Sequence, residues 1–395
     1  MRGSFKLGKI AGIEIGIHYT WIFAFVLFAW IFAQGTFPAF FPNWTTAGYW
    51  VAGVLVSVLI FVSVLIHELC HSLVAISRGM KVSSIVFFVF GGVSNIEKEP
   101  DSAWVEFIMA GAGPLSSLVL GGIFYALTLA VRATGDTTSL LYGILGVMAY
   151  VNILLAVFNL IPGFPLDGGR VFRSIVWGIT HSLHTATLIA GNVGRFFGWA
   201  MILFGIANFF PGFNINGFQG NLLNGVWFIF IGWFLTSAAD TAIKEQSLQE
   251  HLAGVKVKDV MDTSPECVSP NAPVDRIVHE SFIQHGRRAL PICNESGLLG
   301  IVTLADVKKI PQDRWADTPV QAVMTQNPLQ SVDQEADLND ALRQLGQNSL
   351  NQIPVLYQGK LVGLLSRADV IRYLQTRQEL GIKPRTNTKN QNLPI

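Results

Sequence analysis

The sequence predicts a polytopic α-helical membrane protein followed by a water-soluble α/β region, and composition, charge distribution and an internal repeat carry this prediction. The 395 residues are 51% hydrophobic and 13% charged, with 28 Phe and 10 Trp, which is too apolar for an ordinary soluble protein. Residues 1–250 carry 22 of the 53 Asp, Glu, Lys and Arg residues, and the remaining 145 residues carry 31. We therefore expect the first part in lipid and the second in water.

Six apolar stretches are long enough to span a bilayer. A helix needs about 20 apolar residues to cross the hydrocarbon layer. The basic N-terminal residues precede an apolar stretch without a small-residue cleavage site, so we expect the first stretch to be retained as a span. Residues 1–245 are the predicted transmembrane domain. The stretches lie near 17–36, 49–77, 103–131, 139–161, 186–209 and 218–238.

Basic residues predict the orientation of the spans. With a cytoplasmic N-terminus, chiefly Arg132 lies outside and the other basic residues flank the inner ends of spans, as the positive-inside rule favours. We therefore expect a multi-pass protein of the cell membrane with both termini in the cytoplasm. Arg195 falls within the fifth span, where it either snorkels or faces a polar cavity. The basic residues at the inner ends are Arg78, Lys81, Lys98, Arg170, Arg173 and Lys244.

Residues 81–96 interrupt the helical pattern between the second and third spans. They are rich in Val, Ile and Phe and are broken at Gly91–Gly92, which predicts a short β-hairpin. The segment is too apolar for bulk water and too short to span, so we expect it at the membrane interface. Its edge either holds an extended peptide or the hairpin only closes the helix bundle.

The net charge argues against one class of partner, and the cysteines predict a redox state. The net charge is +1 and no basic cluster is long enough to neutralise a run of phosphates, so nucleic acid is excluded as a partner. Cys70, Cys267 and Cys293 form neither a CxxC pair nor an even framework. The predicted state of all three is therefore the reduced thiol on a non-oxidising face.

The sequence His67-Glu68-Leu-Cys-His71 lies inside the second apolar stretch. Histidines at i and i+4 project from one helix face and can bind a single Zn²⁺, with Glu68 beside the metal. These polar side chains would be costly in lipid without a compensating cation. A catalytic zinc takes three protein ligands and keeps one position open, so a third ligand is expected elsewhere.

Asp167 is the strongest candidate for that third ligand. It lies in a segment where Pro162 and Pro165 break the helix at the end of the fourth span, and Gly168–Gly169 allow a tight turn. An isolated carboxylate at this depth is expensive unless it meets a cation.

These motifs resemble the site-2 protease family of intramembrane zinc metalloproteases. The resemblance rests on the HExxH motif, on Gly111-Ala-Gly113-Pro114, and on the segment Asn159-x-x-Pro-x-x-Pro-Leu-Asp-Gly-Gly. It implies one Zn²⁺ held by His67, His71 and Asp167, with Glu68 as the general base. The family commonly has Asn three positions after the Gly-Pro, where this chain has Ser117. Asn152 and Asn159 are either interhelical hydrogen-bond donors or oxyanion donors, and the family pattern makes Asn159 the candidate that helps shape the site.

A repeat with a constant offset of 63 residues fills the polar part of the chain. Val257–Met261 recurs as Val320–Met324, and Gly300–Val307 recurs as Gly363–Val370. Such a repeat predicts two copies of one α/β unit that bury a face against each other. The copies resemble a tandem pair of CBS domains, which implies a cytoplasmic regulatory module that can dimerise. The expected boundaries are 246–256 for a linker, 257–312 and 320–377 for the domains, and 378–395 for a disordered tail.

Each repeat contains a hydroxyl residue followed by an Asp three positions later. By resemblance to CBS pairs, Thr303 with Asp306 and Ser366 with Asp369 are candidate sites for an adenine nucleotide such as AMP, ADP or ATP. The same residue pairs are good helix N-caps, so the pattern has two interpretations.

The functional prediction is a zinc endopeptidase that cleaves single-pass transmembrane proteins within the lipid bilayer and is modulated by nucleotide binding to its CBS domains. The alternative is a membrane transporter or channel that is gated by the CBS domains and holds a structural metal. The spans show no internal repeat of the kind many transporters carry, and the polar residues gather at one place. Both observations favour the protease.

Overall fold

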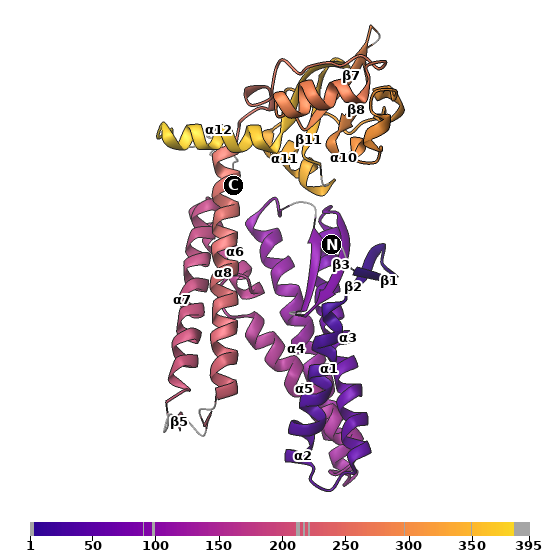
Figure 1. The fold of residues 1–395 in the computed structure, drawn as a ribbon. Helices are drawn as coiled ribbons and strands as arrows, with labels where there is room; N and C mark the ends of the chain where they lie inside the picture. The colour runs from indigo at the N-terminus through magenta and orange to yellow at the C-terminus, as the bar shows by residue number, and fades with distance from the viewer. Residues whose placement is uncertain are drawn as a thin grey trace. The chain divides into compact units, whose positions relative to one another are not determined.

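The computed structural model describes residues 4–89, 91–96, 99–210, 214–215, 218–219, 222–295, 297–348 and 350–382. The chain divides into two compact units, Met1–Gln246 and Ser247–Ile395. Figure 1 shows the course of the chain through the helical first unit and the mixed α/β second unit. Each unit is described by itself below.

Six helices of the described chain are long and apolar enough to cross a membrane, which confirms the predicted polytopic fold. The first span combines α1 and α2, which a single π-helical turn, Phe32–Thr36, joins into a continuous segment. The helices are α1 Thr20–Ile31, α2 Phe37–Phe40, α3 Thr46–Ser77, α4 Ala103–Ala133, α5 Leu140–Asn159, α7 Leu183–Ala207 and α8 Leu222–Leu252.

A shorter helix, α6 (Asp167–Thr180), follows the turn after α5 and is absent from the predicted set of spans. The two glycines at its start pack against the turn itself. A Cβ atom would lie 2.3 Å from the Leu160 carbonyl group at Gly168, and 2.3 Å from the Gly163 carbonyl carbon at Gly169. Only glycine permits this close approach, so the double glycine folds the turn back onto the helix start.

The sheet of the first unit is larger than the predicted hairpin. Strands β3 (Val82–Phe88) and β4 (Gly91–Ile96) match the prediction for residues 81–96, but β1 (Ser4–Ile10) and β2 (Ile13–His18) extend the sheet in the order β1-β2-β3-β4. The β2–β3 pair is parallel and the other pairs are antiparallel. The two N-terminal strands were not predicted, although apolar residues alternate with polar or small ones along Ser4–Ile10. Strand β4 lies at one edge of the sheet.

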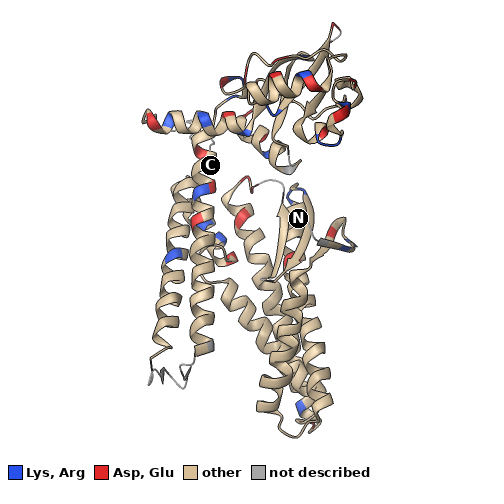
Figure 2. Ribbon diagram, in the orientation of Figure 1, with Lys and Arg blue, Asp and Glu red and all other residues tan. Residues whose placement is uncertain are grey.

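Charged side chains are unevenly placed in the first unit, where most of them gather toward the end that carries the sheet (Figure 2). Arg195 of α7 lies in a span, and its Nε atom is 3.1 Å from Asp240 Oδ1 of α8. The two helices approach closely, since a Cβ atom at Gly198 would lie 2.3 Å from Thr236 Oγ1. Arg195 therefore meets an acidic partner on the neighbouring helix, which neither the snorkelling nor the polar-cavity hypothesis had named.

The second unit contains two three-stranded sheets, β7-β8-β9 and β10-β11-β12. Each sheet has its own buried cluster, with Val274, Leu290 and Val302 in one and Leu338, Ile353 and Leu365 in the other. This arrangement confirms the predicted α/β pair. Its strands are β7 Ala289–Asn294, β8 Gly297–Thr303, β9 Thr325–Gln326, β10 Val332–Asp333, β11 Gln352–Tyr357 and β12 Lys360–Ser366, and its helices are α9 Val274–Arg276, α10 Leu304–Val307, α11 Leu338–Gln347 and α12 Arg367–Glu379.

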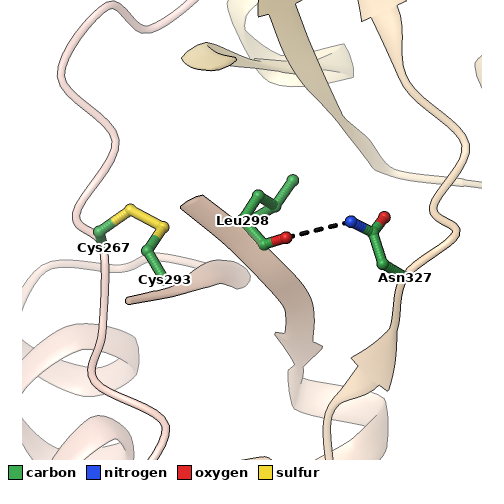
Figure 3. The surroundings of a disulfide bond; sticks show 4 residues. All are labelled: Cys267, Cys293, Leu298 and Asn327. Carbon is green, nitrogen blue, oxygen red and sulfur yellow. Dashed lines mark hydrogen bonds between the residues drawn. A yellow bond between two sulfur atoms is a disulfide. The ribbon is translucent and has the colours of Figure 1, made fainter. Parts of the chain in front are cut away.

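Two of the three cysteines form a disulfide bond, Cys267–Cys293 (Figure 3). The prediction that all three are reduced was therefore wrong for this pair. Val268 pairs with Ile292 in a parallel bridge, and Cys293 N donates to Val268 O at 3.1 Å. This pairing sets the two cysteines side by side, although 26 residues separate them in the sequence. The cysteines consequently give no support to a non-oxidising face.

Candidate functional site

Helix α3 carries the His67-Glu68-x-x-His71 motif on the face that points into the first unit. His67 and His71 are 4% and 7% exposed. They are one turn apart, and their imidazole rings meet edge to face with centroids 4.9 Å apart. The helix starts at a capped Thr45, whose side chain accepts a hydrogen bond from Gly48 N. A regular 32-residue helix therefore presents both imidazoles to one point.

Asp167, the first residue of α6, completes the cluster. Its Oδ2 atom lies 3.0 Å from His67 Nε2 and 3.1 Å from His71 Nε2, and the two Nε2 atoms are 3.3 Å apart. Among the described residues, these three form the group of histidine, cysteine and acidic side chains that could hold a metal ion. The structure thus brings together the three residues that the sequence and the resemblance nominated.

The other ring nitrogen of each histidine is engaged by α4. His71 Nδ1 donates to the Met109 carbonyl oxygen at 2.6 Å, and because a carbonyl only accepts, the proton of a neutral His71 is on Nδ1 and its Nε2 lone pair is free. His67 Nδ1 lies 2.9 Å from Ser117 Oγ. Such outer hydrogen bonds orient histidine ligands in metal sites. Ser117, which replaces the commoner Asn of the family, therefore makes a polar contact with a candidate ligand.

The separations between the three ligand atoms fit a zinc ion. Zinc binds histidine nitrogen and carboxylate oxygen at about 2.0–2.2 Å in a tetrahedral arrangement. Ligand atoms at the corners of such a tetrahedron are about 3.3 Å apart, close to the observed 3.0–3.3 Å. Two imidazole nitrogens and a carboxylate oxygen are ligand types that zinc prefers in proteins. The donor set therefore suits zinc.

Two glycines leave space around the motif. A Cβ atom at Gly113 of α4 would lie 2.1 Å from His71 Nε2 and 2.6 Å from His67 Nε2, at the face of the imidazoles where a metal would bind. A Cβ atom at Gly92 of β4 would lie 2.6 Å from Glu68 Cγ. Any larger residue at either position would displace the motif.

Glu68 is held by the edge strand of the sheet. Ser94 Oγ of β4 donates to Glu68 Oε2 at 2.7 Å, and Ser72 Oγ donates to Ser94 Oγ at 3.3 Å. Sequence reasoning missed Ser94, which belongs to an element outside the motif, whereas the family resemblance had already marked the position of Ser117. Their roles depend on the packing of α4 and β4 against α3.

The two asparagines of α5 make no hydrogen bond to this cluster among the described residues. Asn152 is fully buried and its Nδ2 donates to Met148 O at 2.9 Å. Asn159 is the last residue of α5 and is half-buried. Among the hydrogen bonds of the described residues, neither contacts His67, Glu68, His71 or Asp167.

Of the two candidate nucleotide sites, one lines a cleft in the second unit. The cleft has a volume of about 660 Å³, and Thr303, Asp306, Arg288 and Lys308 are among its lining residues. Ser366 and Asp369 are not among them. In both repeats the Asp accepts hydrogen bonds from the backbone and hydroxyl of the paired Thr or Ser, so both pairs are N-caps in the structure.

The Asp306 carboxylate is stabilised in its charged form. Burial disfavours the charge, but hydrogen bonds from Lys309 and Thr303 outweigh burial and hold the pKa of Asp306 below its ordinary value. Lys309 Nζ lies 2.9 Å from Asp306 Oδ1. An anionic Asp306 at the cleft wall suits hydroxyl donors of a ligand.

Two buried histidines and an aspartate inside a helical membrane unit, with a glutamate beside them, have the ligand types and the base that a metallohydrolase site uses. The model of peptidase family M50 matches residues 55–143 and 130–204, and the CBS domain model matches residues 257–313 and 320–376. The chain belongs to peptidase family M50.

The similarity to relatives extends over nearly the whole chain. Two curated relatives carry the name "Putative zinc metalloprotease": sll0528 of Synechocystis sp., 34% identical over 95% of this chain and 97% of that protein, and Rip3 of Mycobacterium tuberculosis, 30% identical over 99% and 98%. A solved structure titled Site-2 Protease from Methanocaldococcus jannaschii is 29% identical, with a TM-score of 0.41, and covers 61% of this chain and 95% of that one. The family model and the two curated relatives confirm the predicted family, and membership of a peptidase family favours a protease over the alternative of a transporter.

Proposed function

We propose that this protein is an intramembrane zinc metalloprotease that hydrolyses peptide bonds of single-pass transmembrane proteins. The observation that carries the proposal is the convergence of His67 Nε2, His71 Nε2 and Asp167 Oδ2 within 3.3 Å of one another, on helices α3 and α6. A metal ion is the group that such a buried donor set fits. Glu68 lies next to these ligands on α3.

In this proposal His67, His71 and Asp167 hold one Zn²⁺, and Glu68 is the general base. When bound, zinc lowers the pKa of a coordinated water and polarises the peptide carbonyl. Glu68 takes the proton of the attacking water and passes it to the departing amine. Ser94 fixes the carboxylate through Oε2, which leaves Oε1 available for the proton.

The proposed substrate must unwind before cleavage, because the peptide groups of a transmembrane helix are hidden by their own hydrogen bonds. Strand β4 is an edge strand and can add an extended peptide through main-chain hydrogen bonds. Its residues Gly92 and Ser94 contact Glu68. A peptide paired with β4 would thus lie beside the general base.

The proposed location is the cell membrane, with both termini and the CBS domains in the cytoplasm. The support is the distribution of charge in the first unit, where Lys and Arg gather at the end that carries the sheet (Figure 2). Basic residues favour the cytoplasmic end of a span.

We further propose that AMP, ADP or ATP binds the cleft at Thr303 and Asp306 and modulates the protease, and that the CBS domains can mediate dimerisation. The cleft volume of about 660 Å³ lies in the range of small-molecule sites. Arg288 and Lys308 supply positive charge for phosphate groups. Calorimetric titration of the full-length protein with each nucleotide tests binding, and no heat with any of them would refute it.

The substitution Glu68→Gln tests the catalytic proposal. The variant should retain zinc, since Gln does not alter the three ligands, and should lose cleavage of a co-expressed membrane substrate by about 100-fold to 10,000-fold. Glu99→Gln, at an exposed residue, is the matched control and should cleave normally. Full activity of Glu68→Gln would overturn the proposal.

A further inference from the structure

Glu106 and Arg173 form a buried ion pair that joins α4 to α6. Glu106 has no exposed surface and Arg173 is 6% exposed. Arg173 Nε donates to Glu106 Oε1 at 2.8 Å, and Nη2 of the same guanidinium contacts the same oxygen. Arg170 Nε lies 3.7 Å from it. One carboxylate oxygen therefore faces cations from two positions of α6.

This ion pair is poorly suited to stabilise the fold by itself. Burying two charges costs free energy that their attraction recovers only when their remaining polar atoms are also satisfied. Glu106 Oε2 is buried and has no hydrogen-bond partner among the described residues. Two apolar side chains of similar volume would hold the helices together equally well. A role in setting the arrangement of α4 and α6 explains the pair better than a contribution to stability.

The geometry at stake is the depth and rotation of α6, whose start packs against the preceding turn through Gly168 and Gly169. The helix has 14 residues and no side-chain hydrogen bond at its N-cap, Leu166. A helix of this length cannot span the bilayer, which needs about 20 residues, so the membrane does not set its depth or rotation. Asp167 is its first residue, and any rotation of α6 would move the carboxylate away from the histidines.

The partner of Arg173 lies on the same face of α4 that contacts the histidines. Glu106, Met109, Gly113 and Ser117 follow one another at helical spacing. Met109 and Ser117 engage the two imidazoles, and Glu106 engages α6. Helix α4 thus contacts both α3, which carries the two candidate histidine ligands, and α6, which carries the third candidate ligand.

Arg173 makes two further contacts. Its Nη1 atom donates to Thr187 Oγ1 of α7 at 3.4 Å, and its Cζ atom lies 5.1 Å from the centre of the Phe164 ring. Phe164 belongs to the turn that precedes Asp167. The guanidinium therefore touches α4, α7 and the turn at once, about two helical turns from the candidate ligand.

We propose that Glu106 and Arg173 are positioning residues, whose buried ion pair sets α6 against α4 so that the Asp167 carboxylate meets His67 and His71. This inference rests on the proposed role of Asp167 as a metal ligand. The pair touches neither the metal site nor the reacting groups, and it acts through the orientation of α6.

The test uses the full-length protein in detergent micelles, stripped of metal and titrated with Co²⁺, whose visible absorption reports the coordination geometry. Glu106→Gln should weaken Co²⁺ binding by about 10-fold to 100-fold, as loss of an outer partner of a ligand does, and should lower the intensity of the four-coordinate bands. Asp240→Asn removes the acid of the exposed Arg195–Asp240 pair and is the control that should bind as the wild type does.

The double variant Glu106→Gln with Arg173→Met separates positioning from the cost of an unpaired charge. Because it leaves no buried charge unpaired, the double variant should regain the thermal stability of the wild type. Its Co²⁺ binding should remain weak and its spectrum altered. If Glu106→Gln alone does not fold, the double variant serves as the test. Wild-type Co²⁺ binding in either variant would overturn the inference while the metal site stands. A wild-type protein that binds no Co²⁺ would instead overturn the proposed function, and this inference with it.

Discussion

The candidate metal site of the first unit and the cleft of the second unit arrange their polar side chains differently. At the candidate metal site, His67, His71 and Asp167 direct three ligand atoms at one buried point, an arrangement that suits a cation. At the cleft, Asp306 already accepts hydrogen bonds from Thr303 and Lys309 and is satisfied without a ligand. The two sites therefore differ in the direction of their polar atoms: three ligand atoms converge on one point in the first unit, whereas the Asp306 carboxylate is occupied by contacts within its own N-cap.

The largest effect is expected from a substitution that fills the space in front of the proposed metal ligands. Gly113→Ala should weaken zinc binding by more than about 100-fold, beyond the loss expected for an outer partner of a ligand, because its Cβ atom would lie 2.1 Å from His71 Nε2. Zinc affinity by competition with a chelator measures the effect.

Gly111→Ala is the matched control for this substitution. Gly111 is on the same helix and has open space at its Cβ position, so the change should leave zinc affinity unaltered and can only favour the helix, by up to about 1 kcal/mol. Equal zinc affinity in both variants would mean that the metal does not occupy the space in front of the imidazoles.

A smaller effect is expected from the outer hydrogen bond of His67. Ser117→Ala removes the hydroxyl that lies 2.9 Å from His67 Nδ1 and should weaken zinc binding by about 10-fold to 100-fold. Ser116→Ala is the control, since Ser116 bonds only to the Gly113 carbonyl of its own helix. If both variants bind zinc equally, Ser117 does not orient the ligand.

The smallest effect is expected at the N-caps of the second unit. Asp306→Asn and Asp369→Asn should each lower the free energy of unfolding by about 1 kcal/mol, because each carboxylate accepts the hydrogen bonds of a cap. Only Asp306→Asn should also weaken AMP binding, since Asp306 lines the cleft and Asp369 does not. Equal AMP affinity in the two variants would remove the distinction between the repeats.

The pH dependence of the Asp306 effect has a definite sign. The pKa of Asp306 is lowered in the folded protein, with burial opposing and the hydrogen bonds from Lys309 and Thr303 causing the shift. The charged form therefore stabilises the fold above the unfolded pKa of about 3.9, and this contribution is lost as the pH falls through the folded value. The stability difference between the wild type and Asp306→Asn should consequently shrink below about pH 4 in chemical denaturation experiments.

Where local signals were strong, the sequence predicted the helices and the three side chains that the structure brings together. Hydrophobic length alone located the spans, and the residues of HExxH need only a regular helix to meet. Asp167 could be nominated as the third candidate ligand because the prolines and glycines around it predict a turn. The repeat offset of 63 residues located both α/β copies. In each case the signal lies within one contiguous segment.

What the sequence missed depends on contacts between distant segments. Ser94 contacts Glu68 only because β4 packs against α3, and no local pattern predicts this; the position of Ser117 was marked by the Gly-Pro motif, but its contact with His67 depends on the packing of α4 against α3. Cys267 and Cys293 meet because Val268 pairs with Ile292. The strand Ser4–Ile10 did carry a signal, the alternation of Phe5 and Leu7 with polar or small residues, but its short length and basic flank resemble the start of a span.

Metal analysis of the purified full-length protein tests the central claim most directly. The wild type should contain about one zinc per chain, His67→Ala should contain none, and His279→Ala, at an exposed histidine of the second unit, should keep the metal. A wild-type protein without zinc, or a His67→Ala variant that retains it, would contradict the account.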